Sequence, residues 1–137
     1  MWRTIAGIIA GLVAWILIVT LLNWGLRLSL PGYSQVEQSM SFTLGMKIAR
    51  LSIGALSSLG AGALTRAIAP ANRLAPWVVG LLMVALFVPL HVQIWNKFPI
   101  WYHLTFLITL APLVALGAWL VTRAKSSPAQ GGIPSRR

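Results

Sequence analysis

Two kinds of residue are almost absent from this chain of 137 residues. It has no cysteine, and Glu37 is its sole acidic side chain. Without cysteine the chain cannot form disulfides, thiolate metal sites or dithiol redox pairs. Because Glu37 lies outside the long apolar segments, no carboxylate is available inside a membrane for proton-coupled transport or acid–base catalysis. No Ser-His-Asp set and no glycine-rich phosphate loop is present either, so we expect a protein that is not an enzyme.

Charged residues of both signs are also scarce. They make up 9% of the chain, against about 25% in soluble domains, while 58% of the residues are hydrophobic and the mean hydropathy is +0.81. A water-facing surface cannot be built from this composition, which indicates an integral membrane protein of one domain. The net charge of +10 would favour nucleic acid in a soluble protein. Here the cations flank apolar segments, so we expect anionic lipid head groups and no nucleic acid.

Four segments are apolar over the about 20 residues that a membrane helix needs. They cover about residues 4–26, 47–69, 75–95 and 100–121. The second segment can also begin as early as Ser39, and Pro31-Gly32 and Pro99 mark two of the breaks. We expect an all-α bundle of four transmembrane helices with short loops over 1–125, then a disordered basic tail over 126–137. The first segment is longer than the apolar core of a signal peptide and lacks a cleavage site, so we expect it to be retained.

The positive charges predict the orientation of the bundle. An even number of helices places both chain ends on one side, and that side holds more Lys and Arg than the other. The first side carries Arg3, Arg66, Arg73, Arg123, Lys125, Arg136 and Arg137, and the second carries Arg27, Lys47, Arg50 and Lys97. The positive-inside rule then puts both termini in the cytoplasm of a multi-pass protein of a bacterial inner membrane.

Small residues recur at four-residue spacing in the first two segments. They are Gly7 and Gly11 in the first segment, and Gly54, Ser58 and Gly62 in the second. Membrane helices associate by close packing, which small residues permit. The pattern therefore predicts either packing of the first helix on the second or an interface with a partner chain.

Polar residues near the outer boundary form a second group. Lys47 and Arg50 are three residues apart and share a helix face, and Asn23 lies near the end of the first segment. Contact with lipid head groups is the simpler interpretation for the two cations. The alternative is an entrance that attracts an anion, with Asn23 as a hydrogen-bonding residue between helices.

The stretch from His91 to His103 holds both histidines of the chain, together with Trp95, Trp101 and Tyr102. Since the flanking helices are joined by a very short turn, they must be antiparallel neighbours, and the two imidazoles fall at similar depth. An interfacial anchor is the interpretation we favour, because aromatic and basic residues gather at membrane boundaries. A haem or chlorin, or a quinone, at His91 and His103 is the alternative. A metal site lacks further ligands, so we expect no metal and no obligatory cofactor.

The residues Trp95-Asn-Lys-Phe-Pro99-Ile-Trp-Tyr-His103 resemble a turn found in small bacterial inner-membrane proteins of four helices. The resemblance is best over the third and fourth segments. The resemblance implies a four-helix fold in a bacterial inner membrane. It implies no activity and identifies no functional residues.

Three functions follow as hypotheses. The first is a non-catalytic protein that acts by association, as an accessory subunit of a membrane complex or as a homo-oligomer, through the small residues. The second is a small channel or transporter for an anion or amphiphile. The third is a quinone- or cofactor-binding membrane protein.

Overall fold

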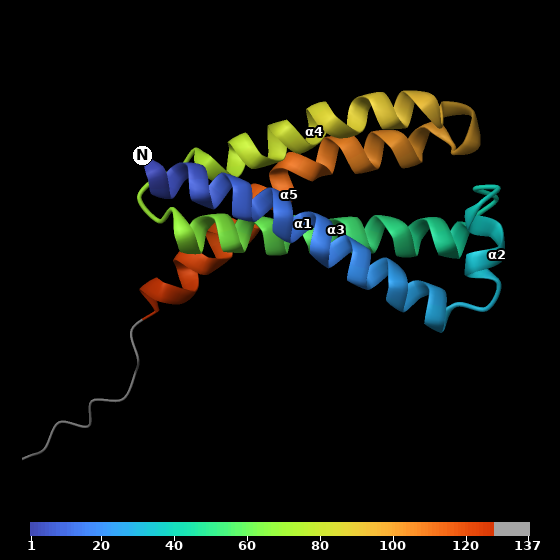
Figure 1. The fold of residues 1–137 in the computed structure, drawn as a ribbon, viewed down its shortest axis with the longest axis horizontal. Helices are drawn as coiled ribbons and strands as arrows, with labels where there is room; N and C mark the ends of the chain where they lie inside the picture. Colours follow the sequence, from blue (N-terminus) through green and yellow to red (C-terminus); the bar gives the residue numbers. More distant parts are fainter. Residues whose placement is uncertain (128–137) are drawn as a thin grey trace, which may run out of the picture.

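The computed structural model describes residues 1–127, and over this range the chain is all-α (Figure 1). Four helices are long and apolar enough to cross a membrane: α1 (Trp2–Ser29), α3 (Leu44–Ile68), α4 (Ala75–Gln93) and α5 (Ile100–Ser126). Two short elements connect them: α2 (Tyr33–Glu37), and the 3-10 turn η1 (Trp95–Lys97). The predicted all-α class with four long apolar helices is confirmed for the described residues. The predicted disordered tail lies almost wholly outside them.

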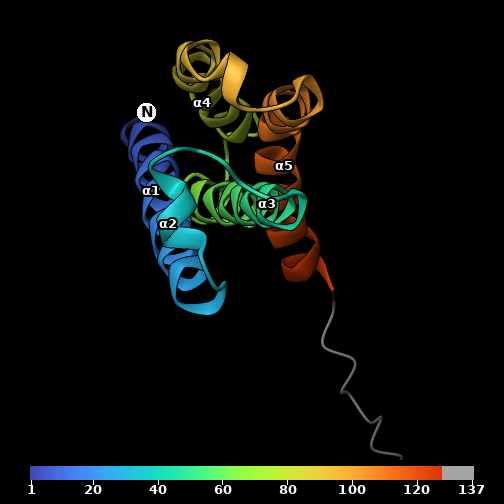
Figure 2. The same cartoon turned by 90° about the vertical axis from the view of Figure 1, so that its right-hand side faces the viewer.

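The long helices alternate in direction, so the described chain begins and ends at the same end of the bundle (Figure 1). We call this the terminal end, and the opposite end, which carries α2 and η1, the α2 end. Helix α3 is central and packs on α1 and α5, while α4 packs mainly on α5 (Figure 2). Helix α1 starts beside the start of α4, and the two helices diverge toward the α2 end (Figures 1 and 2).

Small residues bring α3 close to both of its main neighbours. A Cβ added at Gly7 would lie 2.9 Å from the Cβ of Ala69, and one at Gly11 would overlap the hydroxyl of Thr65. On the other side of α3, a Cβ at Gly62 would overlap the carbonyl oxygen of Val114 in α5. Such close approach lets the backbones of apolar helices pack without large side chains between them.

The helix boundaries differ from those expected from hydropathy. Helix α3 begins at Leu44, before the expected Lys47 and after the alternative Ser39, because the hydroxyl of Thr43 accepts from the Met46 amide 3.3 Å away and caps the helix. Helix α5 continues to Ser126 instead of ending near residue 121. The last turns of α1 and α5 are basic, which suits the negative end of a helix dipole and extends each helix beyond its apolar stretch.

The connection from α1 to α3 is not the short loop that we expected. Gly32 adopts a left-handed conformation with φ 77°, and α2 follows it directly. The connection folds over the α2 end and buries Tyr33 and Phe42 against Phe98 and Tyr102. Phe42 and Phe98 stack with centroids 5.8 Å apart, and Phe98 and Tyr102 with centroids 4.4 Å apart. This aromatic cluster holds α2 against α3 and α5, and it thereby fixes the position of Glu37 at the end of α2.

Candidate functional site

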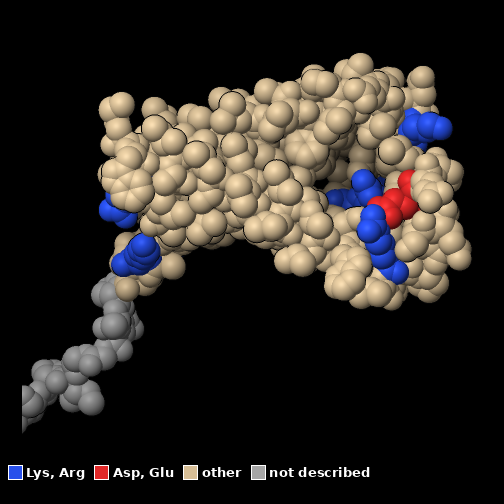
Figure 3. All heavy atoms as spheres, in the orientation of Figure 1, with Lys and Arg blue, Asp and Glu red and all other residues tan. Residues whose placement is uncertain are grey.

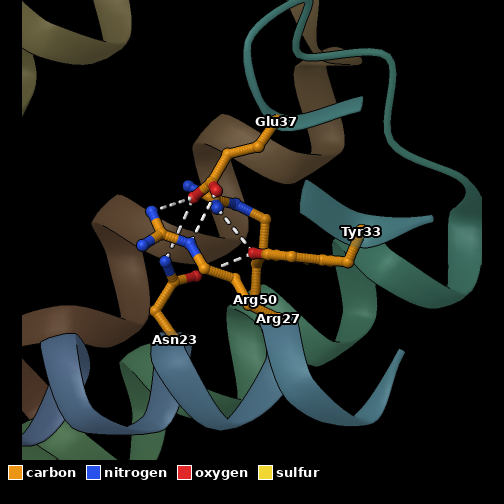
Figure 4. Close-up of polar contacts among 5 residues, drawn as sticks. All are labelled: Asn23, Arg27, Tyr33, Glu37 and Arg50. Atoms are coloured by element: carbon orange, nitrogen blue, oxygen red, sulfur yellow. Dashed lines mark hydrogen bonds and ion pairs between the residues drawn. The ribbon is translucent and has the colours of Figure 1, made fainter. Parts of the chain in front are cut away.

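The single acidic side chain, Glu37, is bound by side chains of α1 (Figure 4). Arg27 donates from Nε to Glu37 Oε2 at 2.7 Å and from Nη2 to Oε1 at 2.9 Å. Asn23 donates from Nδ2 to Oε1 at 3.1 Å. A two-point arginine–carboxylate pair of this kind fixes the orientation of both groups. Glu37 is therefore neutralised by Arg27.

Arg50 is joined to the same network through a neutral group. Its Nη1 donates to the hydroxyl of Tyr33 at 2.8 Å, and that hydroxyl donates to Asn23 Oδ1, also at 2.8 Å (Figure 4). The guanidinium also lies 4.7 Å from the centre of the Phe42 ring. Its Nε is buried and has no hydrogen-bond partner among residues 1–127. A guanidinium has five N–H donors and no acceptor, and the direct ion pair of Glu37 is with Arg27, so Arg50 forms no direct ion pair with a described carboxylate.

The protonation states of the two α2 residues support this description. The hydrogen bond from Arg27 lowers the pKa of Glu37, with a further contribution from Asn23, and partial burial opposes the shift. Burial raises the pKa of Tyr33, and the hydrogen bond from Arg50 opposes that shift. At neutral pH Glu37 is thus an anion and Tyr33 a neutral phenol. The network of two guanidiniums and one carboxylate carries a net charge of +1.

The network forms one wall of a cavity of about 710 Å³, visible as a hollow at the α2 end (Figure 3). The other walls come from all four long helices and are mostly apolar. Its apolar lining includes Trp15, Val19, Ile53, Phe87 and Phe106, and its polar lining includes Asn23, Arg27, Glu37, Arg50, His91, Gln93 and Tyr102. Ligand sites commonly have volumes of about 300–1,000 Å³, with apolar walls and a few polar groups. The cavity has the composition of a site for a molecule with one charged end.

The two histidines meet beside this cavity. His91 Nδ1 lies 2.8 Å from His103 Nδ1, and His103 Nε2 lies 3.2 Å from the carbonyl oxygen of Trp95. The exposed fractions are 5% for His91 and 0% for His103, so neither ring reaches the outer surface as an anchor would. Direct contact between the two nitrogens leaves no space for a haem iron between the rings. Trp95 and Trp101 are the exposed aromatic residues of the stretch, while Tyr102 is buried.

The small residues singled out in the sequence all lie inside the bundle. Gly7, Gly11, Gly54, Ser58 and Gly62 are buried. Ser58 accepts a hydrogen bond from Trp15 Nε1 at 3.0 Å and donates to the Gly54 carbonyl at 2.8 Å. A face that packs on other helices of the same chain is not available to a second chain unless the bundle opens.

A smaller cavity lies at the terminal end. It measures about 380 Å³, and its lining includes Arg66, Arg73, Trp77, Trp119 and Thr122. Arg66 donates from Nε to the Thr122 hydroxyl at 3.0 Å. Arginine beside tryptophan at the end of an apolar bundle is the combination that membrane boundaries favour, in keeping with the expected contact with lipid head groups.

Sequence reasoning found part of the site at the α2 end. Asn23 and Arg50 are brought together as polar partners of one network, whereas Lys47 takes no part in it. Arg27, Tyr33 and Glu37 were missed as site residues. A lone acidic residue in a strongly basic membrane chain was the signal that could have found them, because such a charge needs a partner.

Comparisons of the chain with models of known families, with curated proteins and with solved structures find no match.

Proposed function

We propose that this chain is a multi-pass protein of a bacterial inner membrane that binds an anionic amphiphile in the cavity at the α2 end. The observation that carries the proposal is Arg50, a cation that lines the 710 Å³ cavity and donates to a neutral hydroxyl instead of a carboxylate. Arg27 is matched by Glu37, so Arg50 is the cation available to an anionic head group.

The apolar walls favour an amphiphile over a small inorganic anion. Trp15, Phe87 and Phe106 form one aromatic group, with centroids of Phe87 4.9 Å from Trp15 and 5.1 Å from Phe106. These rings offer contact to a hydrocarbon chain, and they offer nothing to a hydrated anion. Helices α1 and α4 diverge toward the α2 end (Figure 2), and side chains of both helices line the cavity.

The terminal half of the bundle favours binding over passage through a channel. A Cβ at Gly80 of α4 would lie 2.6 Å from the Cα of Ala111 in α5, and Gly7 and Gly11 contact α3 as closely. Helices in such contact leave no gap along these two seams of the bundle. Both chain ends in the cytoplasm, as the basic residues predict, would make the cavity open toward the outer leaflet.

The test is binding of phosphatidylglycerol to the protein in nanodiscs of phosphatidylcholine, followed by native mass spectrometry. A charge-assisted hydrogen bond contributes about 1.5–3 kcal/mol, so Arg50→Gln should weaken binding by about 10- to 150-fold. Lys97→Gln is the matched control, because Lys97 is an exposed cation at the same end but does not line the cavity.

A second variant tests the cavity without touching the charge network. Val19→Phe adds a ring to the apolar wall and should also weaken binding, while leaving Arg50 and its partners in place. Thermal unfolding of each variant checks that it is folded. Wild-type affinity in folded Arg50→Gln and Val19→Phe proteins would refute the proposal.

A further inference from the structure

The hydrogen atoms on His103 follow from its partners. The carbonyl oxygen of Trp95 can only accept, so the His103 Nε2 that lies 3.2 Å from it carries a hydrogen. In a neutral imidazole the other nitrogen, Nδ1, is then an acceptor. The ring is held in this place by stacking on Trp95, with centroids 4.6 Å apart.

The hydrogen on His91 follows in turn. Two nitrogens 2.8 Å apart share one hydrogen, and since His103 Nδ1 accepts, His91 Nδ1 donates. The remaining nitrogen of a neutral His91, Nε2, is therefore an acceptor. It makes no hydrogen bond to any described residue, and His91 lines the large cavity.

No free carboxylate of the described residues lines the cavity beside the pair. Arg50 lines the same cavity as His91, and Glu37, the one acidic side chain of the sequence, is paired with Arg27. The other groups packed on His91 are uncharged rings: Phe106 and Tyr102 from α5 and Phe87 from α4. A charged imidazole would thus have no described carboxylate to pair with.

We propose that His91 Nε2 accepts a hydrogen bond from a hydroxyl group of the bound amphiphile. The inference rests on the proposed function and narrows the ligand to anionic amphiphiles whose head group carries a hydroxyl beside the anionic group. Arg50 binds the anionic group, and His91, held by His103, accepts a hydrogen bond from the hydroxyl. His103 acts through His91 as a positioning residue, because its Nδ1 holds the hydrogen of His91 away from the cavity.

The test compares two lipids of equal charge and nearly equal size. Phosphatidylglycerol and phosphatidylpropanol share the phosphodiester and three head-group carbons, and only the first has hydroxyls. One hydrogen bond between neutral groups predicts that wild type prefers phosphatidylglycerol by about 2- to 10-fold. His91→Phe should bind the two lipids equally, whereas Arg50→Gln should weaken both.

The outcomes separate the two proposals. Equal binding of the two lipids by wild type, or a preference that survives in His91→Phe, overturns the inference and leaves the proposed function standing. Failure of wild type to bind either lipid overturns the proposed function. Nitrogen-15 NMR of the wild-type protein gives an independent readout: we expect hydrogen on Nδ1 of His91 and on Nε2 of His103. Hydrogen on Nε2 of His91 would overturn the inference whatever the lipid data show.

Discussion

The crossing of α3 and α5 at Gly62 allows a stability prediction worked from the structure. A Cβ at this position would overlap the carbonyl oxygen of Val114 and lie 2.7 Å from its carbonyl carbon and 3.1 Å from the Ala118 amide. Backbone atoms cannot rotate away as a flexible side chain can. Gly117 of α5 meets the backbone of Leu59 just as closely, so the crossing is tight on both helices. Even Gly62→Ala must push the helices apart.

The magnitude comes from two opposing effects. Overpacking of a tight contact costs about 1–3 kcal/mol, whereas replacing a helical glycine by alanine gains about 0.5–1 kcal/mol. Gly25→Ala is the matched control, because Gly25 also lies in a long helix and an added Cβ there meets nothing within 4 Å. The difference in unfolding free energy between the two variants isolates the overpacking effect, so we expect Gly62→Ala to be less stable than Gly25→Ala by about 1–3 kcal/mol.

The assay is reversible unfolding of the purified chain in mixed micelles, with native mass spectra recorded on the same samples. Packing of Gly62 within the chain predicts lower unfolding free energy and an unchanged number of chains. If Gly62→Ala unfolds like Gly25→Ala but changes the number of chains in the particle, Gly62 lies at an interface between chains and our reasoning is wrong. That result would support association through the small residues as the function.

Three further predictions concern the network and the core. The ionised form of Glu37 contributes stability that is fully present above the ordinary carboxyl pKa of about 4.3 and is lost as the pH falls through the depressed pKa of Glu37. Glu37→Gln should therefore have a lower melting temperature than wild type at pH 7, and its melting temperature should fall less in acid. Tyr33→Phe removes the link between Arg50 and Asn23, so its unfolding free energy should fall by about 1–3 kcal/mol; a neutral effect would mean that the hydroxyl is dispensable. Trp15→Phe removes the donor to Ser58 and should lower the unfolding free energy by about 0.5–1.5 kcal/mol in addition to the loss from packing. A double-mutant cycle with Ser58→Ala measures this hydrogen-bond contribution, and additive effects of the two changes would show that the bond contributes nothing.

The long helices could be predicted from the sequence because their signal is local. The composition of each apolar run indicates a membrane helix, and the short turn around Pro99 forces α4 and α5 to be antiparallel neighbours. The four-residue spacing of Gly54, Ser58 and Gly62 likewise indicated close helix packing, although it could not say whether the neighbour belonged to the same chain.

The network could not be predicted, because it depends on where α2 folds. Tyr33 and Glu37 lie in a connection without apolar periodicity, and their partners Asn23 and Arg50 are 10 to 17 residues away in sequence. The depth of Arg50 also depended on where α3 begins, which the Thr43 cap decides. The histidines were expected at similar depth, but their direct hydrogen bond could not be predicted without the positions of both rings. That bond determines which nitrogen of His91 is the acceptor that faces the cavity.

The central claim is that an amphiphile occupies the cavity beside Arg50, and photolabelling tests it most directly. A phosphatidylglycerol analogue with a diazirine on the first carbons of one acyl chain would be cross-linked to the protein in nanodiscs, and the labelled residues would be located by peptide mass spectrometry. Our account predicts labels on the cavity walls, at Val19 of α1 and Phe87 of α4, and their loss in Arg50→Gln. Labels confined to the outward side chains of α5, such as Leu116 and Leu120, and unchanged in Arg50→Gln would contradict it.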